Sequence, residues 1–332
     1  LAYAILAPNP HNRQPWQFEL VGQDEILVRV DLERRLPHTD PFDRQITIGF
    51  GCMLELLRIA AAEQGYRAEI TAFPEGEGAP RLDDRPIARV KFVPDRAEAD
   101  PLFSAILTRR STKEPYDTAR PVAADTLAAV IAGGAGALGT GGTTDPAQTA
   151  RIVDLAWTGF QIELATDLTR RESVDLMRIG NRAVTENPDG IDMGGIQMGL
   201  LKMVGFVDHE SLDTPGSTAY KAGLDMYDPI IHSAQGFVWV TADANTRQTQ
   251  LEAGQAWVRM NLAAQQRGVC VHPLSQILQE FPEMAGPYQS IREELSITGE
   301  GVIHMLGRVG YTKFPKPSPR WPLQSKLIDQ SA

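Results

Sequence analysis

Residues 109 to 113, Arg-Arg-Ser-Thr-Lys, place three cations and two hydroxyl groups next to one another. Guanidinium groups bind phosphate oxygens through paired hydrogen bonds, a serine hydroxyl can donate another, and a lysine adds a point charge. The run follows an apolar turn and precedes Pro115. This combination predicts a turn that binds phosphate, and a solvated surface turn stays open as the alternative.

The segment APNPHNRQPW, residues 7 to 16, sets three prolines among amide, imidazole, guanidinium and indole side chains. Proline donates no backbone hydrogen bond, so this segment is neither a regular helix nor a central strand. It predicts a stiff loop rich in hydrogen-bonding groups. A second proline-rich basic stretch covers residues 313 to 326. That stretch is either a tail packed through Trp321 and Leu323 or a disordered one.

Other chemistries have little support in the sequence. A GxGxxG string at residues 134 to 139 follows a predicted helix rather than a strand, which excludes a dinucleotide-binding turn. The chain has no Walker A sequence, no GxSxG and no HExxH. The six histidines are scattered, and Cys52 and Cys270 lack the spacing of a zinc site. We therefore expect neither a metal site nor a protein nucleophile, and we expect both cysteines to be buried.

The composition is that of an ordinary globular protein, with a net charge of -10 over 332 residues. Nucleic acid and anionic membrane surfaces are disfavoured as partners because both repel a net anionic surface. No uninterrupted apolar run reaches the roughly 18 residues of a membrane span. The compartment stays open: cytoplasmic is the default, and export is the alternative if a cleaved signal preceded Leu1.

One order of elements occurs twice: a strand, a long amphipathic helix, a glycine stop and a strand. The predicted ranges are 26–30, 46–64 and 87–93 in the first copy, and 236–242, 251–267 and 302–309 in the second. The helices align without a gap, so that Gly51 meets Gly254 and Gly65 meets Gly268. This indicates one structural unit used twice, and chance similarity of two amphipathic helices is the alternative. Small residues on both helices would let them approach closely, as at a two-fold interface.

The residues between these copies predict further helices and two irregular segments. Helices are expected over residues 101–108, 123–132 and 147–171. The string GGAGALGTGGTTD predicts a flexible linker. Residues 187 to 219 are rich in Gly and Met, which is typical of a mobile lid.

The motifs together resemble those of the nitroreductase family, flavin enzymes that bind FMN between two subunits. PNPHNRQPWQF (8–18) is similar to the family's P-S-x-x-N-x-Q-P-W-x-F loop, and RRSTK to its phosphate motif. Residues 251 to 275 resemble the central interface helix and the turn after it, and Arg320-Trp321-Pro322 the C-terminal phosphate-binding arginine. The resemblance touches most of the chain outside residues 140 to 220.

The order of the motifs differs from that of ordinary members, because here the loop precedes RRSTK. This order, with the repeated unit, resembles the single-chain, Acg-like branch, in which two halves form an internal pseudo-dimer. The resemblance implies an α+β, nitroreductase-like fold with antiparallel-rich mixed sheets flanked by helices. It also implies an N-terminal half (1–98), a C-terminal half (99–332) with a lid insertion at about 173–222, a monomer, and one FMN per chain.

The resemblance also implies which residues contact the FMN, while no protein side chain is assigned a catalytic role because the flavin carries the chemistry. The phosphate would be held by Arg109, Arg110, Ser111, Lys113 and Arg320. The ring and ribityl chain would be lined by Pro8, Asn9, Asn12 and Gln14 and by Pro273, Leu274 and Ser275. Asn9 stands where the family usually has Ser, so its hydrogen bond is in question. Ser275 would offer its backbone amide to flavin N5.

The implied activity is NAD(P)H-dependent, two-electron reduction of nitroaromatics, quinones or similar small acceptors, by ping-pong hydride transfer at N5. The first alternative is an FMN-sequestering protein whose lid prevents turnover. Flavin-degrading chemistry and a scaffold without a cofactor also remain open.

Overall fold

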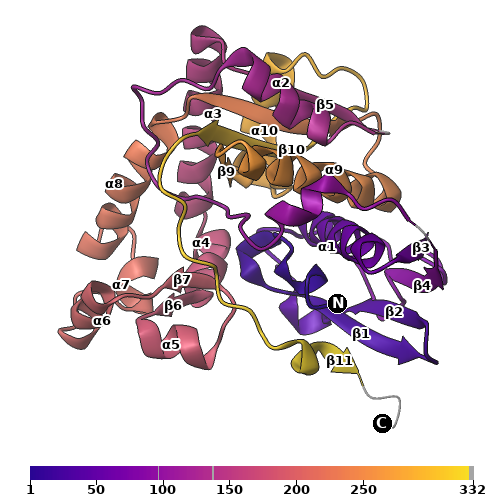
Figure 1. Ribbon diagram of the computed structural model, residues 1–332. Helices are drawn as coiled ribbons and strands as arrows, with labels where there is room; N and C mark the ends of the chain where they lie inside the picture. Colours follow the sequence, from indigo (N-terminus) through magenta and orange to yellow (C-terminus); the bar gives the residue numbers. More distant parts are fainter. Residues whose placement is uncertain (96, 137, 329–332) are drawn as a thin grey trace.

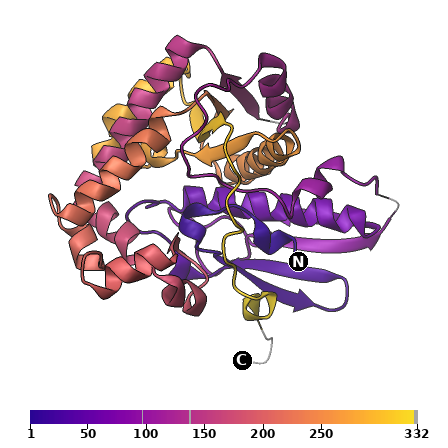
Figure 2. The same ribbon diagram turned by 60° about the vertical axis from the view of Figure 1, so that its left-hand side comes forward.

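The structure is a computed structural model and describes residues 1–95, 97–136 and 138–328. Its first sheet has five strands in the order β11-β1-β2-β4-β3. These are β1 (Trp16–Val21), β2 (Glu25–Val30), β3 (Tyr66–Ala72), β4 (Ala88–Pro94) and β11 (Leu327–Ile328). All neighbours are antiparallel except β1 and β11, where Phe18 pairs with Leu327 in parallel. The C-terminal tail therefore crosses the molecule to complete the N-terminal sheet (Figure 2).

The second sheet is antiparallel throughout, in the order β5-β8-β10-β9. Its strands are β5 (Gly139–Thr143), β8 (Gly236–Ala242), β9 (Cys270–Pro273) and β10 (Val302–Gly310). Every residue of β10 is buried, as expected for a central strand covered on both faces. The predicted α+β class with antiparallel-rich sheets flanked by helices is confirmed.

Helices α1 (Arg44–Glu63) and α9 (Arg247–Gln266) pack against each other between the two sheets (Figure 1). They cross at Gly51 and Gly254: a Cβ at Gly51 would overlap the Leu251 carbonyl, and one at Gly254 the Ile48 carbonyl. The Cys52 thiol donates a hydrogen bond to the Gly254 carbonyl at 3.1 Å. The predicted close approach through small residues is therefore confirmed.

By length and composition α1 could also cross a membrane, although the chain was expected to have no such span. This is weak evidence, because 78% of its apolar window is buried inside the fold. Its position against α9 is that of a core helix.

The remaining helices either lie around the second sheet or build the side of the molecule at the left of Figure 1. They are α2 (Ala124–Gly133), α3 (Pro146–Ala165), α4 (Asp167–Asp175), α5 (Asn181–Glu186), α6 (Ile196–Met203), α7 (His209–Asp213), α8 (Thr218–His232) and α10 (Ala285–Glu294). A small parallel pair, β6 (Met177–Ile179) and β7 (Ile191–Met193), lies among them. Phe160 of α3 and Leu306 of β10 share one core cluster, whereas Val309 of β10 packs in the other.

Two expectations about elements are wrong. The predicted flexible linker contains β5, which pairs along its length with β8; its Ala137 lies outside the described residues, as do the last residues of the predicted C-terminal half. The single helix predicted over residues 147–171 is broken at Thr166, whose extended backbone (ψ 117°) separates α3 from α4.

Candidate functional site

Three arginines from distant segments converge at the RRSTK turn. Ser111 forms a bridge with Val271 of β9, which fixes the turn to the edge of the second sheet. Arg109 and Arg320 both donate to the carbonyl of Leu6, at 3.3 and 3.4 Å. Arg110 is close enough that its charge lowers the pKa of both. The structure thus brings the two predicted phosphate-binding segments together.

No carboxylate neutralises these arginines within the described parts of the chain. Their hydrogen bonds go to backbone carbonyls, to the Ser111 hydroxyl and, from Arg320 at 2.7 Å, to Asn12 Oδ1. Burial lowers the pKa of Arg109 to about 10, and burial with the charges of Arg109 and Arg110 lowers that of Arg320 to about 9. Clustered cations without a counter-ion favour an anionic ligand.

Lys113, at the end of the RRSTK run, is exposed. Its charge lowers the pKa of His11, of His272 and of the Glu163 carboxyl, so it lies near all three. Lys113 therefore extends the positive surface from the arginines toward β9 and α3.

The loop before β1 is held in a left-handed conformation at three residues that carry side chains. His11, Asn12 and Gln14 have φ values of 46°, 51° and 50°, which non-glycine residues adopt rarely and often at functional sites. Asn9 stabilises the loop internally: its Oδ1 accepts from the Gln14 backbone at 2.8 Å and its Nδ2 donates to Ala7. Pro8, half-buried, precedes it.

Gln14 is hydrogen-bonded within the protein. Its side chain is fully buried, its Nε2 donates to the Pro188 carbonyl at 2.7 Å, and its Oε1 accepts from the Trp321 backbone at 2.9 Å. Its amide thus joins three segments of the protein. Asn12 is used in the same way, since its Nδ2 donates to Pro319 while its Oδ1 holds Arg320.

The turn after β9 presents a free backbone amide. The Leu274 amide donates to Leu306 at 2.9 Å, whereas the Ser275 amide has no partner among the described residues. Pro273 pairs with Gly307 at the end of β9. Leu274 is buried and Ser275 half-buried, so the turn is fixed in position while this N–H remains available.

The sequence did not single out two buried histidine rings, those of His11 and His272. His11 Nδ1 is buried without a partner, and burial with the charges of Lys113 and Arg13 lowers the pKa of His11 to about 3. His272 Nδ1 accepts from Arg308 at 2.9 Å, and burial lowers its pKa well below the ordinary value. Both rings are neutral at pH 7. His11 stands inside the loop that attracted attention, whereas His272 becomes notable only through its tertiary neighbours.

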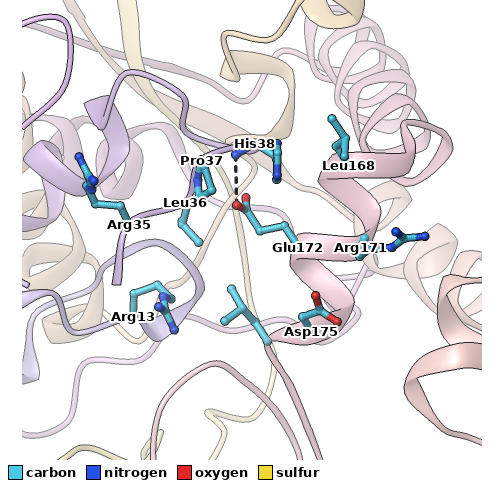
Figure 3. Close-up of a pocket in the computed structure, with 10 residues that line it drawn as sticks. Arg13, Arg35, Leu36, Pro37, His38, Leu168, Arg171, Glu172 and Asp175 are labelled. Carbon is cyan, nitrogen blue, oxygen red and sulfur yellow. Dashed lines mark hydrogen bonds between the residues drawn. The ribbon is translucent and has the colours of Figure 1, made fainter. Parts of the chain in front are cut away.

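A cavity of about 280 Å³ is lined by none of the three clustered arginines. Leu36, Pro37 and His38 form one wall and α4 forms the other (Figure 3). Glu172 of α4 accepts hydrogen bonds from the His38 and Thr39 amides, at 3.1 and 2.8 Å, and ties the two walls together. Among the residues that the structure describes, no group of three or more His, Cys, Asp or Glu is placed to hold a metal ion.

Comparisons with curated proteins identify relatives in Mycobacterium tuberculosis. The chain is 36% identical over 121 residues to one called "Uncharacterized protein", covering 35% of this chain and 34% of the relative. It is 32% identical over 116 residues to the "Putative NAD(P)H nitroreductase acg", covering 34% of this chain and 33% of that protein. The chain thus matches about a third of the length of these relatives. They confirm the resemblance to the nitroreductase family and its Acg-like branch.

No family model matches the chain. Among solved structures, similar ones include a nitroreductase-like protein from Bacillus cereus, with 14% identity, a TM-score of 0.39, and coverage of 71% of this chain and 98% of that one. The FMN-dependent nitroreductase NfnB from Mycobacterium smegmatis, solved with NADPH, has 16% identity, a TM-score of 0.41, and coverage of 67% and 94%. At these scores the likeness is too weak to support an argument.

Proposed function

We propose that the chain is an FMN-binding oxidoreductase of the nitroreductase family, which uses NAD(P)H to reduce small acceptors such as nitroaromatics or quinones. The observation that carries this proposal is the cluster of Arg109, Arg110 and Arg320, which has no carboxylate partner among the described residues. The names of the relatives point to the same activity.

The phosphate would be held by Arg109, Arg110, Ser111, Lys113 and Arg320. A phosphomonoester carries a charge between about -1.5 and -2 at pH 7 and three strong acceptor oxygens. Planar guanidinium groups match those oxygens, and partial burial strengthens each bond. This assignment explains why three cations are gathered where burial, together with their mutual repulsion, lowers the pKa of Arg320.

Two polar groups left without partners fit the rest of the FMN. The Ser275 N–H is free at the end of β9, where it would hold the N5 edge of the ring, next to Pro273 and Leu274. His11 Nδ1 is buried and unpaired, and a ligand hydroxyl or N–H would satisfy it. Pro8, Asn9 and Asn12 would shape the loop side of the ring. Gln14 would act indirectly, by fixing the loop.

FMN, when bound, supplies the capacity to accept and pass on a hydride. The protein's residues anchor, orient and tune it. The arginines would neutralise the phosphate, and the Ser275 amide would donate to N5 of the oxidised ring and so orient that edge. No side chain is required as nucleophile.

We also propose that the two halves form an internal pseudo-dimer. The strand order β1-β2-β4-β3 in the first sheet matches β5-β8-β10-β9 in the second, and α1 corresponds to α9. Gly65 follows α1 and Gly268 follows α9 at the same distance from the end of the helix, and both have positive φ, 78° and 68°. The halves would be 1–98 and 99–332, and the lid predicted at about 173–222 would belong to a longer insertion between β5 and β8.

FMN sequestration without turnover remains the second candidate. The turn before β7 is hydrogen-bonded to the loop of residues 7–16. Gln14 Nε2 donates to the Pro188 carbonyl, and the Gly190 amide donates to the Asn12 carbonyl. A lid held this closely could exclude a nicotinamide from the ring.

Anaerobic mixing of the FMN-loaded protein with NADPH or NADH separates the two candidates. The oxidoreductase proposal predicts bleaching of the flavin absorbance, followed by its recovery when a quinone is added. Retained FMN that neither nucleotide bleaches, while dithionite does, would contradict the activity and favour sequestration.

A further inference from the structure

Asp189 lies at a junction of three segments that are far apart in the sequence. Its carboxylate, 5% exposed, accepts from Arg34 of the N-terminal half, from Arg178 of β6 at 2.7 Å and from the Trp321 indole at 3.2 Å. Its neighbour Gly190 has φ 73°, and a Cβ there would overlap the Leu176 carbonyl. The turn therefore requires glycine directly after Asp189.

The same junction holds the residues around Arg320. The turn contacts the loop through the bonds from Gln14 to Pro188 and from Gly190 to Asn12. Gln14 Oε1 in turn accepts from the Trp321 backbone, and Asn12 Oδ1 accepts from Arg320. Asp189 thus binds the residue after Arg320 directly and approaches Arg320 from the other side through Asn12.

We infer that Asp189 is a positioning residue for the anion site: it fastens the turn of the insertion to the Asn12–Gln14 loop and to Trp321, and thereby keeps Arg320 directed at the phosphate. This inference rests on the proposed function. Asp189 itself touches no ligand. Its loss would release the Trp321 indole and loosen the turn against the loop, while Arg320 would keep its hydrogen bonds to Asn12 and to backbone carbonyls.

Charge and burial explain why a carboxylate fits this position. Burial alone would raise the pKa of Asp189, but hydrogen bonds from Arg178, Arg34 and Trp321 outweigh it and lower that pKa. The group is therefore ionised at neutral pH. Asparagine has nearly the same shape but leaves the partly buried Arg178 without an anionic partner, whereas Arg34 keeps Asp31.

The test compares FMN with riboflavin, which lacks the phosphate, in four variants: Asp189→Asn, Arg320→Ala, both together, and the control Asp213→Asn. Asp213 also binds two arginines, Arg170 and Arg171, but remote from the anion site. We expect Asp189→Asn to weaken FMN about tenfold and to leave riboflavin within about twofold. In the Arg320→Ala background, Asp189→Asn should cause no further loss of FMN affinity, because both changes remove the same interaction of Arg320 with the phosphate. Asp213→Asn should bind FMN like the wild type.

The inference would be overturned if the double variant lost FMN affinity by the product of the two single losses. It would also be overturned if Asp189→Asn lost FMN and riboflavin affinity equally. If Asp189→Asn does not fold, Trp321→Phe removes only the indole donor and should also weaken FMN binding; unchanged FMN affinity would count against the inference.

A wild-type chain that binds FMN no better than riboflavin contradicts the proposed function instead. Hydrogen exchange of the backbone amides of residues 12–14 then tests whether Asp189 holds the loop in place. Exchange should be faster in Asp189→Asn than in the wild type, and an unchanged rate would overturn this part of the inference.

Discussion

Arg109 and Arg110 contribute the part of the site on which the phosphate assignment depends most. Each charge-assisted hydrogen bond to a phosphate oxygen contributes about 1.5–3 kcal/mol. The Arg109→Ala, Arg110→Ala double variant should therefore bind FMN more weakly by several kcal/mol, as measured by equilibrium dialysis. Arg182→Ala, an arginine 90% exposed on α5, is the matched control and should change nothing. An unchanged FMN affinity in the double variant would contradict the assignment of these arginines to the phosphate.

Glu163 should make stability depend on pH near neutrality. Burial raises its pKa from 4.5 to about 7, against the hydrogen bonds from Gln279 and Ser173 and the charge of Lys113, while Glu172 reinforces the rise. The folded chain keeps a proton that the unfolded chain loses, so stability falls as pH rises from about 4.5 to about 7. At 1.36 kcal/mol per pH unit, this interval corresponds to at most roughly 3 kcal/mol.

Glu163→Gln should remove this dependence. Gln279 Oε1 has no partner in the described chain and can turn to accept from the new amide. Urea unfolding at pH 5 and pH 8 should show that the stability of the variant relative to the wild type is higher at pH 8 than at pH 5. Parallel stability curves for the two proteins would show that Glu163 is ionised in both states.

At the scale of elements, the crossing of α1 and α9 depends on two glycines. Gly51→Ala forces a methyl group into the Leu251 carbonyl, and overpacking of this kind costs typically 1–3 kcal/mol or more. Gly223→Ala in α8 is the control, because its Cβ would meet nothing within 4 Å; it should stabilise by up to about 1 kcal/mol. Chemical denaturation measures both. A Gly51→Ala protein as stable as the wild type would mean that the helices are not constrained at this crossing.

The elements that the sequence predicted are those with local signals. The α1 and α9 helices show regular apolar spacing and end before Gly65 and Gly268, so their positions follow from periodicity and a glycine stop. The β5 strand, Gly-Thr-Gly-Gly-Thr, lacks such a signal, because it forms through backbone pairing with β8. The break at Thr166 has no proline or glycine to announce it.

The site shows the same division. The RRSTK turn and the 7–16 loop were predicted because unusual residue types stand next to one another. The roles of Gln14, His272 and Asp189 depend on partners more than 30 residues away, such as Trp321 and Arg34. A single sequence carries no sign of such pairs before the fold is known.

At the scale of the whole molecule, the account predicts a monomer. If the two halves form the proposed pseudo-dimer, the contact of α1 with α9 would take the place of an interface between subunits, and the tail returns to the first sheet through β11. Equilibrium sedimentation should give the mass of one chain. An obligate dimer would contradict the pseudo-dimer, although not FMN binding.

The most direct test of the central claim is calorimetric titration of the purified chain with FMN, with riboflavin titrated in parallel. The account predicts one FMN per chain and much weaker binding of riboflavin, because the uncompensated arginines act on the phosphate. Absence of FMN binding, two equivalents per chain, or equal affinity for both flavins would contradict it.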